Sequence, residues 1–310
     1  MDAEFNGTLI TLGGFVEIDK YRYIYFVILL TLYILILCTN GTIICLIWIH
    51  RNLHEPMYIF IAALSLNSLL FCTVIYPKLF IDVLSQKQII SHSTCMFQYF
   101  LSYSIGISDF LLLSAMSYDR YVSICKPLQY PTIMRKRTVI VLLTVAWSLP
   151  ACEVVVATVI ISKQKLCDFT TNDILCNNSI LKLHCVKSTF LIFYGLFISM
   201  TAVVVPVTFI LFTYMNIFLV IYHSGAEVRK KATETCLPHL MVLFIFLCLS
   251  FFDVIITSLD SHHPKHLRFI MTLQILVYNP LFNPIIYGVK MKEIWKYIQR
   301  LFYQLVNKRI

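Results

Sequence analysis

The segment from Ile24 to Ile49 contains no Asp, Glu, Lys or Arg and is dominated by large apolar side chains. About 20 such residues in an α-helix cross the hydrocarbon core of a bilayer, which is ~30 Å thick. A charge-free stretch of this length therefore predicts a membrane-spanning helix. Six further apolar runs follow, so the sequence predicts an all-α membrane protein, a seven-transmembrane helix bundle. The expected spans are residues 24–49, 57–81, 96–118, 138–161, 189–222, 237–259 and 267–289.

The overall composition supports this prediction. The chain has 310 residues, of which 59% are apolar and 13% are charged, whereas soluble domains average about 45–50% apolar and about 25% charged residues. A water-soluble fold of this composition would leave large apolar patches in water. Seven spans with short links leave no room for another large domain. We therefore expect an extracellular N-terminus (1–23), a seven-transmembrane domain (24–289) and a cytoplasmic amphipathic helix and tail (290–310).

The distribution of charge predicts the orientation of the chain. With the N-terminus outside, 15 of the 25 Lys and Arg residues lie in inner segments and 10 in outer ones, as the excess of basic residues in cytoplasmic loops requires. The glycosylation sequons at Asn6 and Asn177 then both lie outside. The net charge of +9 thus indicates membrane orientation rather than nucleic-acid binding. No cleavable signal peptide is expected before the first span.

The stretch from Lys290 to Tyr303 alternates basic and apolar side chains at helical spacing. Lys292, Lys296 and Arg300 alternate with residues such as Trp295. This pattern predicts a short amphipathic eighth helix that lies on the membrane surface, with membrane lipid as its partner.

Four short strings of residues occur in the order expected of one known family. Asp119-Arg120-Tyr121 lies within the longer string Met116–Pro131, and Asn283-Pro284-Ile285-Ile286-Tyr287 lies in the last span. Leu53–Tyr58 opens the second span and Lys231–Leu240 opens the sixth. Together they resemble the motifs of olfactory (odorant) receptors, a family of rhodopsin-like (class A) G-protein-coupled receptors. The resemblance extends over residues 24–303, and the departures in the Lys231–Leu240 string are similar to fish-type receptors.

The resemblance implies how signalling would occur. Arg120 would be held by Asp119 at rest. An agonist would move the sixth helix outward, and a heterotrimeric G protein would insert into the inner cleft. The residues implied in coupling and activation are Asp119, Arg120, Tyr121, Tyr214, Asn283, Pro284 and Tyr287.

The resemblance also implies a small-molecule odorant pocket in the outer half, between the third, fifth and sixth helices. Ser102 replaces the acid that amine receptors carry at that position, so a simple amine is a less suitable agonist. Apolar and aromatic residues with a few hydroxyls are typical of such pockets. The expected lining is Tyr103, Gly106, Ile107, Ile198, Ala202, Phe251, Phe252 and Ile255.

Four of the eleven cysteines lie in polar outer segments, where disulfides are expected because the outer face is oxidising: Cys95, Cys167, Cys176 and Cys185. The sequence alone permits three pairings of four cysteines, and it also leaves open free thiols or zinc bound with His184. The family resemblance implies the pairs Cys95–Cys176 and Cys167–Cys185.

Three acids lie within predicted spans, where ionisable groups are costly and usually functional. Asp109 lies eleven residues before Arg120 and therefore on nearly the same helix face. The family pairs this acid with an Asp in the second helix to hold a sodium ion, but Ser68 stands at that position here. A weak sodium site, a protonated Asp109 and a hydrogen bond to Ser68 remain alternatives. Glu153 and Asp253 are expected to contact interfacial water, and a place in the lining of the odorant pocket is the alternative for Asp253.

The expected function is that of an odorant receptor that activates an olfactory-type stimulatory G protein, at the plasma membrane of olfactory neuron cilia. We find no P-loop, HExxH or GxSxG motif, so no enzyme, cofactor or metal centre is predicted. A non-olfactory class A receptor for another small ligand is the alternative. A transporter or channel would show internal repeats and charged midplane residues in broken helices, and the sequence shows no repeat.

Overall fold

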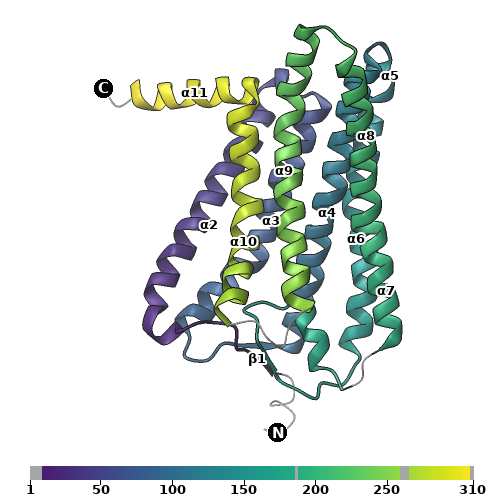
Figure 1. The fold of residues 1–310 in the computed structure, drawn as a ribbon. Coiled ribbons are helices and arrows are strands. Elements are labelled where there is room, and N and C mark those ends of the chain that lie inside the picture. Colours follow the sequence, from purple (N-terminus) through teal and green to yellow (C-terminus); the bar gives the residue numbers. More distant parts are fainter. Residues whose placement is uncertain (1–8, 186–187, 259–264, 308–310) are drawn as a thin grey trace.

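The computed structural model describes residues 9–185, 188–258 and 265–307, and it forms a bundle of long helices (Figure 1). The described ends lie at opposite ends of the bundle, with β1 near one end and α11 at the other. The long elements are α2 (Ile18–Ile49), α3 (Pro56–Leu84), α4 (His92–Cys125), α6 (Lys136–Ser162), α7 (Thr189–Ser199), α8 (Val205–Tyr222), α9 (Ala226–Ser258), α10 (Lys265–Lys290) and α11 (Lys292–Asn307).

These helices confirm the predicted seven-helix arrangement. Within the described ranges, six helical segments are long and apolar enough to cross a membrane, and α9 adds the apolar stretch Cys236–Phe251. Most helices extend several residues beyond the predicted spans, because a helix continues past the hydrocarbon wherever its backbone bonds can form. At the inner end, the short turns η1 (Arg51–Leu53), η2 (Pro127–Gln129) and α5 (Tyr130–Ile133) connect the helices.

The fifth span, predicted at residues 189–222, is interrupted near its middle. α7 and α8 are joined by a π-helical turn, η4 (Met200–Val204), in which the Val205 N–H donates to the Met200 carbonyl five residues earlier. Pro206 follows directly and has no N–H to donate to the carbonyl four residues before it. Single π turns occur within α-helices where the regular backbone hydrogen bonds are interrupted, and they are frequent at functional sites.

The end of the bundle opposite α11 is the outer end (Figure 1). It is covered by a small three-stranded sheet in the order β2-β1-β3. Strand β1 (Leu9–Leu12) pairs antiparallel with β2 (Ile89–Ser91) and parallel with β3 (Thr170–Thr171). The N-terminal segment therefore joins the loop before α4 to the long loop after α6, which contains the turn η3 (Asn178–Leu183).

Two glycines after β1 permit close approach of two backbones. A Cβ built on Gly14 would lie 2.5 Å from the carbonyl carbon of Asp173, and one on Gly13 would lie 2.9 Å from the Thr171 carbonyl oxygen. The backbone N–H of Gly14 also donates to the Asp173 carbonyl at 3.3 Å. No side chain fits between these two segments unless the backbones move apart.

Replacing Gly14 by alanine is therefore expected to destabilise the outer end by about 1–3 kcal/mol, the usual cost of overpacking. Surface delivery, measured with an epitope tag in unpermeabilised cells, should fall several-fold. The matched control is Gly41→Ala, because an added Cβ at Gly41 meets nothing within 4 Å. Equal delivery of the two variants would show that the contact with Asp173 is dispensable.

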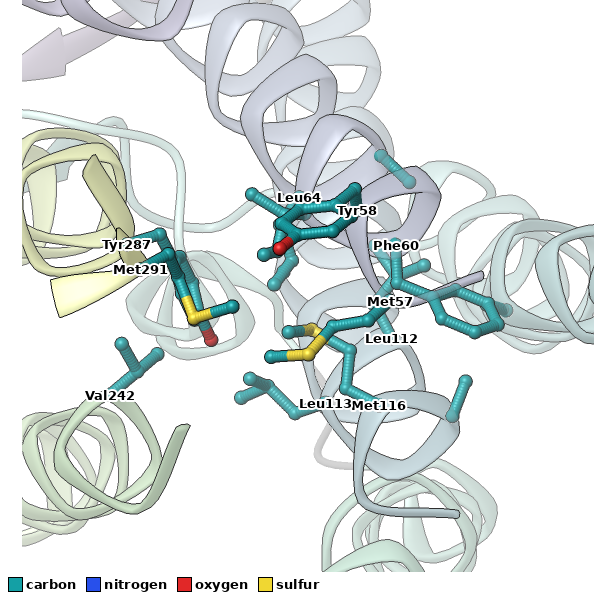
Figure 2. Close-up of a cluster of buried hydrophobic side chains, with 14 of the residues drawn as sticks. Met57, Tyr58, Phe60, Leu64, Leu112, Leu113, Met116, Val242, Tyr287 and Met291 are labelled. Atoms are coloured by element: carbon teal, nitrogen blue, oxygen red, sulfur yellow. The ribbon is translucent and has the colours of Figure 1, made fainter. Parts of the chain in front are cut away.

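Three separate clusters of buried side chains hold the bundle together. The inner cluster joins α3, α4, α9, α10 and α11. Figure 2 shows Met57 of α3 beside Met116 of α4, with Tyr287 of α10 on the opposite side of the cluster from Phe60. The outer half has two clusters. One joins β1 and β2 to α4, α6 and the loop after α6, and the other joins α2, α3 and α10.

Prolines in α10 free two backbone carbonyls, and neighbouring helices satisfy both. Pro284 leaves the carbonyl of Pro280 without its helical donor, and the Asn40 side-chain amide of α2 donates to it at 2.7 Å. Pro280 in turn frees the carbonyl of Leu276, which accepts from the Tyr76 hydroxyl at 3.4 Å. Asn40 lies on a different helix, which local sequence cannot reveal.

The predicted amphipathic eighth helix is α11, which turns away from the bundle at its inner end and runs sideways (Figure 1). Ile294 is fully buried against the inner cluster, whereas Trp295 and Leu301 are 40% and 43% exposed. A helix that keeps apolar side chains exposed beside basic ones suits the membrane surface.

Candidate functional site

The inner end of α4 holds a buried ion pair. Asp119 is fully buried and Arg120 is 9% exposed. The Arg120 Nε donates to Asp119 Oδ2 at 3.0 Å, and a second guanidinium nitrogen donates to the same oxygen. Within the motif Asp119-Arg120-Tyr121, the Asp119 carboxylate thus holds the Arg120 guanidinium. Charge-assisted hydrogen bonds of this type are among the stronger ones in proteins.

Tyr130 provides a further contact to this pair that the sequence motif did not predict. Its hydroxyl, in the short helix α5, donates to Asp119 Oδ1 at 2.8 Å. Burial, followed by the nearby Asp119 carboxylate, raises the pKa of Tyr130, so the phenol remains a donor at neutral pH. Both oxygens of Asp119 are therefore engaged, and the loop after α4 is fixed to the ion pair. Tyr121 lies on a different side of α4 and is partly exposed, with the Lys126 ammonium 5.8 Å from its ring centre.

A second inner contact joins three helices through His239 of α9, which is fully buried. Its Nε2 lies 3.0 Å from the carbonyl oxygen of Leu113 in α4, and its Nδ1 meets the Tyr214 hydroxyl of α8. A carbonyl can only accept, so Nε2 carries the proton and Nδ1 accepts from Tyr214. Sequence reasoning included Tyr214 but missed His239, although it lies in the Lys231–Leu240 string.

Replacing His239 by phenylalanine is expected to raise ligand-independent signalling about thirtyfold, because two hydrogen bonds of about 1 kcal/mol each no longer hold α9 against α4 and α8. Basal cyclic AMP per receptor at the cell surface is the measurement. Tyr214→Phe should have a smaller effect, since it removes one of the two bonds. The exposed His223, which directly follows α8, supplies the control variant, His223→Phe. A basal signal in His239→Phe no higher than in that control would contradict this role.

The residues of the last predicted motif lie in α10 beside the inner cluster. Tyr287 is 1% exposed and Asn283 is 7% exposed. Among the residues that the structure describes, the Tyr287 hydroxyl has no hydrogen-bond partner. Figure 2 shows its side chain between Val242 of α9 and the methionines of α3 and α4. A buried hydroxyl without a partner is costly, so this side chain gains from any rearrangement that supplies one.

The residues of the expected odorant pocket are only partly brought together. Tyr103, Ile107 and Ile198 pack against the outer cluster of α4 and α6, Ala202 is buried in the π turn, and a Cβ on Gly106 would meet nothing within 4 Å. The side chains of Phe252 and Ile255 lie outside the described residues.

Phe251 does not fit that pocket in this structure. It is 65% exposed, so its side chain lies on the outer surface of α9 rather than inside the bundle. The expectation failed because a shift of one residue in the alignment of the sixth span turns the side chain by about 100° and so changes the face on which it lies.

Asp109 of α4 forms its hydrogen bond with Asn67 and not with Ser68, the partner that the sequence analysis considered. The Asn67 amide of α3 donates to Asp109 Oδ1 at 2.8 Å and to the Ile105 carbonyl at 2.8 Å. Trp147 of α6 donates to Asn67 Oδ1 at 3.1 Å. Asn67, not Ser68, therefore links Asp109 to α3. Among the described residues no group of three or more metal-ligating side chains occurs.

Glu153 of α6 was expected to contact interfacial water, but it is 8% exposed. Its Oε1 lies 2.9 Å from the Thr201 hydroxyl in the π turn, and its backbone carbonyl accepts from Tyr194 of α7 at 3.0 Å. This acid thus joins α6 to the fifth span, close to Ile198 and Ala202. The side chain of Asp253 lies outside the described residues.

The outer loops contain both disulfides that the family resemblance implied, Cys95–Cys176 and Cys167–Cys185. The first joins the start of α4 to the loop after α6, and the second closes a short segment within that loop. Asn177 of the second sequon begins η3, where its side-chain oxygen accepts from the Ser179 N–H at 2.9 Å. Asn6 of the first sequon lies outside the described residues.

Comparison with known proteins agrees with this arrangement. A family model described as olfactory receptor matches residues 29–305. Olfactory receptor 10J4 of Homo sapiens is 33% identical over 93% of this chain and 93% of its own length. Olfactory receptor 6E1 of Mus musculus is 30% identical over 98% of this chain and 97% of its own. The crystal structure of squid rhodopsin matches with a TM-score of 0.73 at 18% identity, covering 93% of this chain and 82% of that one.

The helix bundle has the fold of squid rhodopsin, and together with the olfactory receptor relatives this fold defines the class of protein as a rhodopsin-like G-protein-coupled receptor. Within that class, the chain belongs to the olfactory receptor family. It is accordingly an odorant-sensing, multi-pass protein of the plasma membrane, in a family of receptors rather than enzymes.

Proposed function

We propose that this receptor binds a small, mainly apolar odorant in the outer half of the bundle and activates a heterotrimeric, olfactory-type stimulatory G protein at its inner end. The N-terminus and the outer sheet face the exterior, and α11 lies on the cytoplasmic leaflet. Cilia of olfactory sensory neurons are the proposed location.

The contact of His239 with Tyr214 and the Leu113 carbonyl is the observation that carries this proposal. It holds α9 against α8 and α4 at the inner end, while Arg120 is engaged by Asp119. This is the closed member of a pair of states. A ligand shifts such a balance only if it binds one state more tightly, so the odorant must favour an open inner end.

The steps in the opening follow from the groups that the closed state occupies. Outward movement of α9 separates His239 from the Leu113 carbonyl and frees the Tyr214 hydroxyl. The Tyr287 hydroxyl, which has no partner within the described part of the chain, and the Arg120 guanidinium can then form new contacts in the space that α9 leaves. Asn283 and Pro284 supply the irregular segment of α10 that moves with Tyr287. The helix of the G protein enters that space.

The proposed odorant site is bounded by Tyr103, Gly106 and Ile107 on α4 and by Ile198 and Ala202 on the fifth span, with the region of Phe252 and Ile255 on α9. The π turn at η4 supports this placement, since it contains Ala202 and interrupts the regular helix of the fifth span there. The Glu153–Thr201 contact is adjacent and provides polar atoms beside an otherwise apolar lining.

The decisive experiment expresses the full chain with an olfactory-type stimulatory G protein and records cyclic AMP against a panel of volatile and waterborne odorants. At least one odorant should give a saturable rise that is absent from untransfected cells. A ligand-gated current in cells lacking G protein would contradict the proposal, as would a response to hormones or lipids with none to odorants.

A further inference from the structure

The outer half contains a small cavity that the proposed odorant site does not include. It lies between α2, α3 and α10, on the far side of α3 from the cluster of α4 and α6. Its walls include Leu29 and Leu32 of α2, Leu79 and Val83 of α3, and Leu273 of α10. The walls come from helices that contact one another extensively through the third buried cluster, so the cavity is a built part of the bundle.

The outer end of the cavity is covered by segments that lie far apart in the sequence. Phe15, which follows Gly14, is 8% exposed, and Ile174 of the long outer loop is 2% exposed. The rings of Phe15 and Phe269 lie 6.2 Å apart between their centres. The close backbone approach of Gly14 to Asp173 thus places both covering side chains over the cavity.

The accessible wall of the cavity is entirely apolar. Tyr25 contributes only its ring, because its hydroxyl donates to the Val16 carbonyl at 3.2 Å. A buried water needs about two to four polar partners, and this wall offers none. Water is therefore excluded, and a hydrocarbon is the chemically suited occupant.

The size of the cavity limits what can enter. The cavity has a volume of about 50 Å³. One group the size of a water molecule or a methyl needs about 10–15 Å³ of such volume. The space therefore holds about three to five groups of methyl size. That corresponds to a short alkyl segment and excludes a complete ring system with polar substituents.

The cavity also reaches the outer surface of the bundle. Ile28 of α2 lines it and is 50% exposed, on a helix that is predicted to face lipid. A hydrocarbon can thus arrive either from an acyl chain of the bilayer or as a free small molecule dissolved in it.

We propose that the cavity between α2, α3 and α10 is a binding site for a short alkyl group of about three to five carbons, distinct from the odorant site beside α4 and the fifth span. The bound group fills the space under Phe15 and Ile174 and supports the packing of α10 on α2 and α3.

The test uses the purified full chain in lipid nanodiscs and two photoreactive probes. One is a phosphatidylcholine with a diazirine at the end of an acyl chain, and the other is a free short alkyl diazirine without polar groups. After irradiation, labelled residues are mapped by peptide mass spectrometry. Labelling at wall residues such as Leu29, Val83 or Leu273 is expected. The probe that labels them identifies the source of the alkyl group.

Two variants fill the cavity and one controls for them. Leu273 and Val277 of α10 both line the cavity, so Leu273→Phe and Val277→Phe place a ring in the available volume. Both should lower wall labelling about fivefold, because well-packed interiors leave no room for a second occupant. Ile270→Phe changes a 50% exposed position on the same helix and should leave it unchanged. If neither filling variant reaches the cell surface, the smaller change Val277→Ile is used instead. It adds one methylene and should lower wall labelling about twofold.

Absence of wall labelling by both probes would overturn the proposal. So would equal wall labelling in the filled and control variants. Because the measurement requires no odorant and no G protein, its failure would leave the proposed receptor function unaffected, and failure of the cyclic AMP assay would leave this site unaffected.

Discussion

Replacing Arg120 by alanine is expected to abolish odorant-evoked cyclic AMP, with a loss of about tenfold or more. Truncating one partner of a buried, hydrogen-bonded charge pair typically costs about 2–5 kcal/mol, much of it from the charge left unpaired. Here that charge is Asp119, which is fully buried and would keep only its contact with Tyr130. The opened inner end would also lack the cation proposed to meet the G protein. The response is measured per receptor at the surface.

Two further variants separate the role of Arg120 from a general effect of lost charge. Arg120→Lys retains the positive charge but cannot place two donors on one carboxylate in the same way, so partial loss is expected. Arg137→Ala removes an exposed cation at the start of α6 and should leave the response near wild type. An unchanged response in Arg120→Ala with normal surface delivery would refute the coupling mechanism.

The second large effect is expected at the outer end, where Cys176→Ser should prevent most of the receptor from reaching the surface. The Cys95–Cys176 bridge joins residues 81 apart in sequence, and the chain-entropy model assigns about 4 kcal/mol to a crosslink of that span. Marginal proteins often fail to fold after such a loss. Surface delivery is measured by antibody binding to an N-terminal tag, with total protein as reference.

The comparison of single and double variants tests whether the bridge itself is responsible. Cys95→Ser combined with Cys176→Ser should be no worse than either alone, because the same bond is lost once. Cys167→Ser opens a loop of 18 residues and should have a smaller effect, about 3 kcal/mol in the same model. Cys152→Ser, at an exposed free cysteine, is the control. Normal delivery of Cys176→Ser would count against a structural role for the bridge.

Contacts between distant residues account for what the sequence could not predict about the inner end. The string Lys231–Leu240 contains His239, but its partner Leu113 lies 126 residues away. Similarly, proline positions in α10 indicated freed carbonyls, while the donors Asn40 and Tyr76 lie 240 and 200 residues from them. Local patterns report which backbone groups need a partner and not which helix supplies it.

Side-chain direction was the weakest part of the site prediction. Phe251 has the expected residue type at the expected height but faces outward, and Asp109 bonds to Asn67 where its neighbour Ser68 was considered. One residue along a helix turns the side chain by about 100°. An error of a single position therefore exchanges a buried face for a lipid-facing one, even when the span itself is placed correctly.

The sequence by itself determined the seven spans, their membrane setting and the amphipathic helix at the inner end, because hydrocarbon selects long apolar helices by length and charge alone. The motifs likewise placed Asp119, Arg120 and Tyr287 at their positions along the chain. Only the tertiary structure decided the His239 contact, the π turn before Pro206, the Asn67 partner of Asp109 and the apolar cavity under Phe15. Each of these depends on how helices distant in sequence pack together, and burial of a polar group or a void is a property of all the helices that surround it.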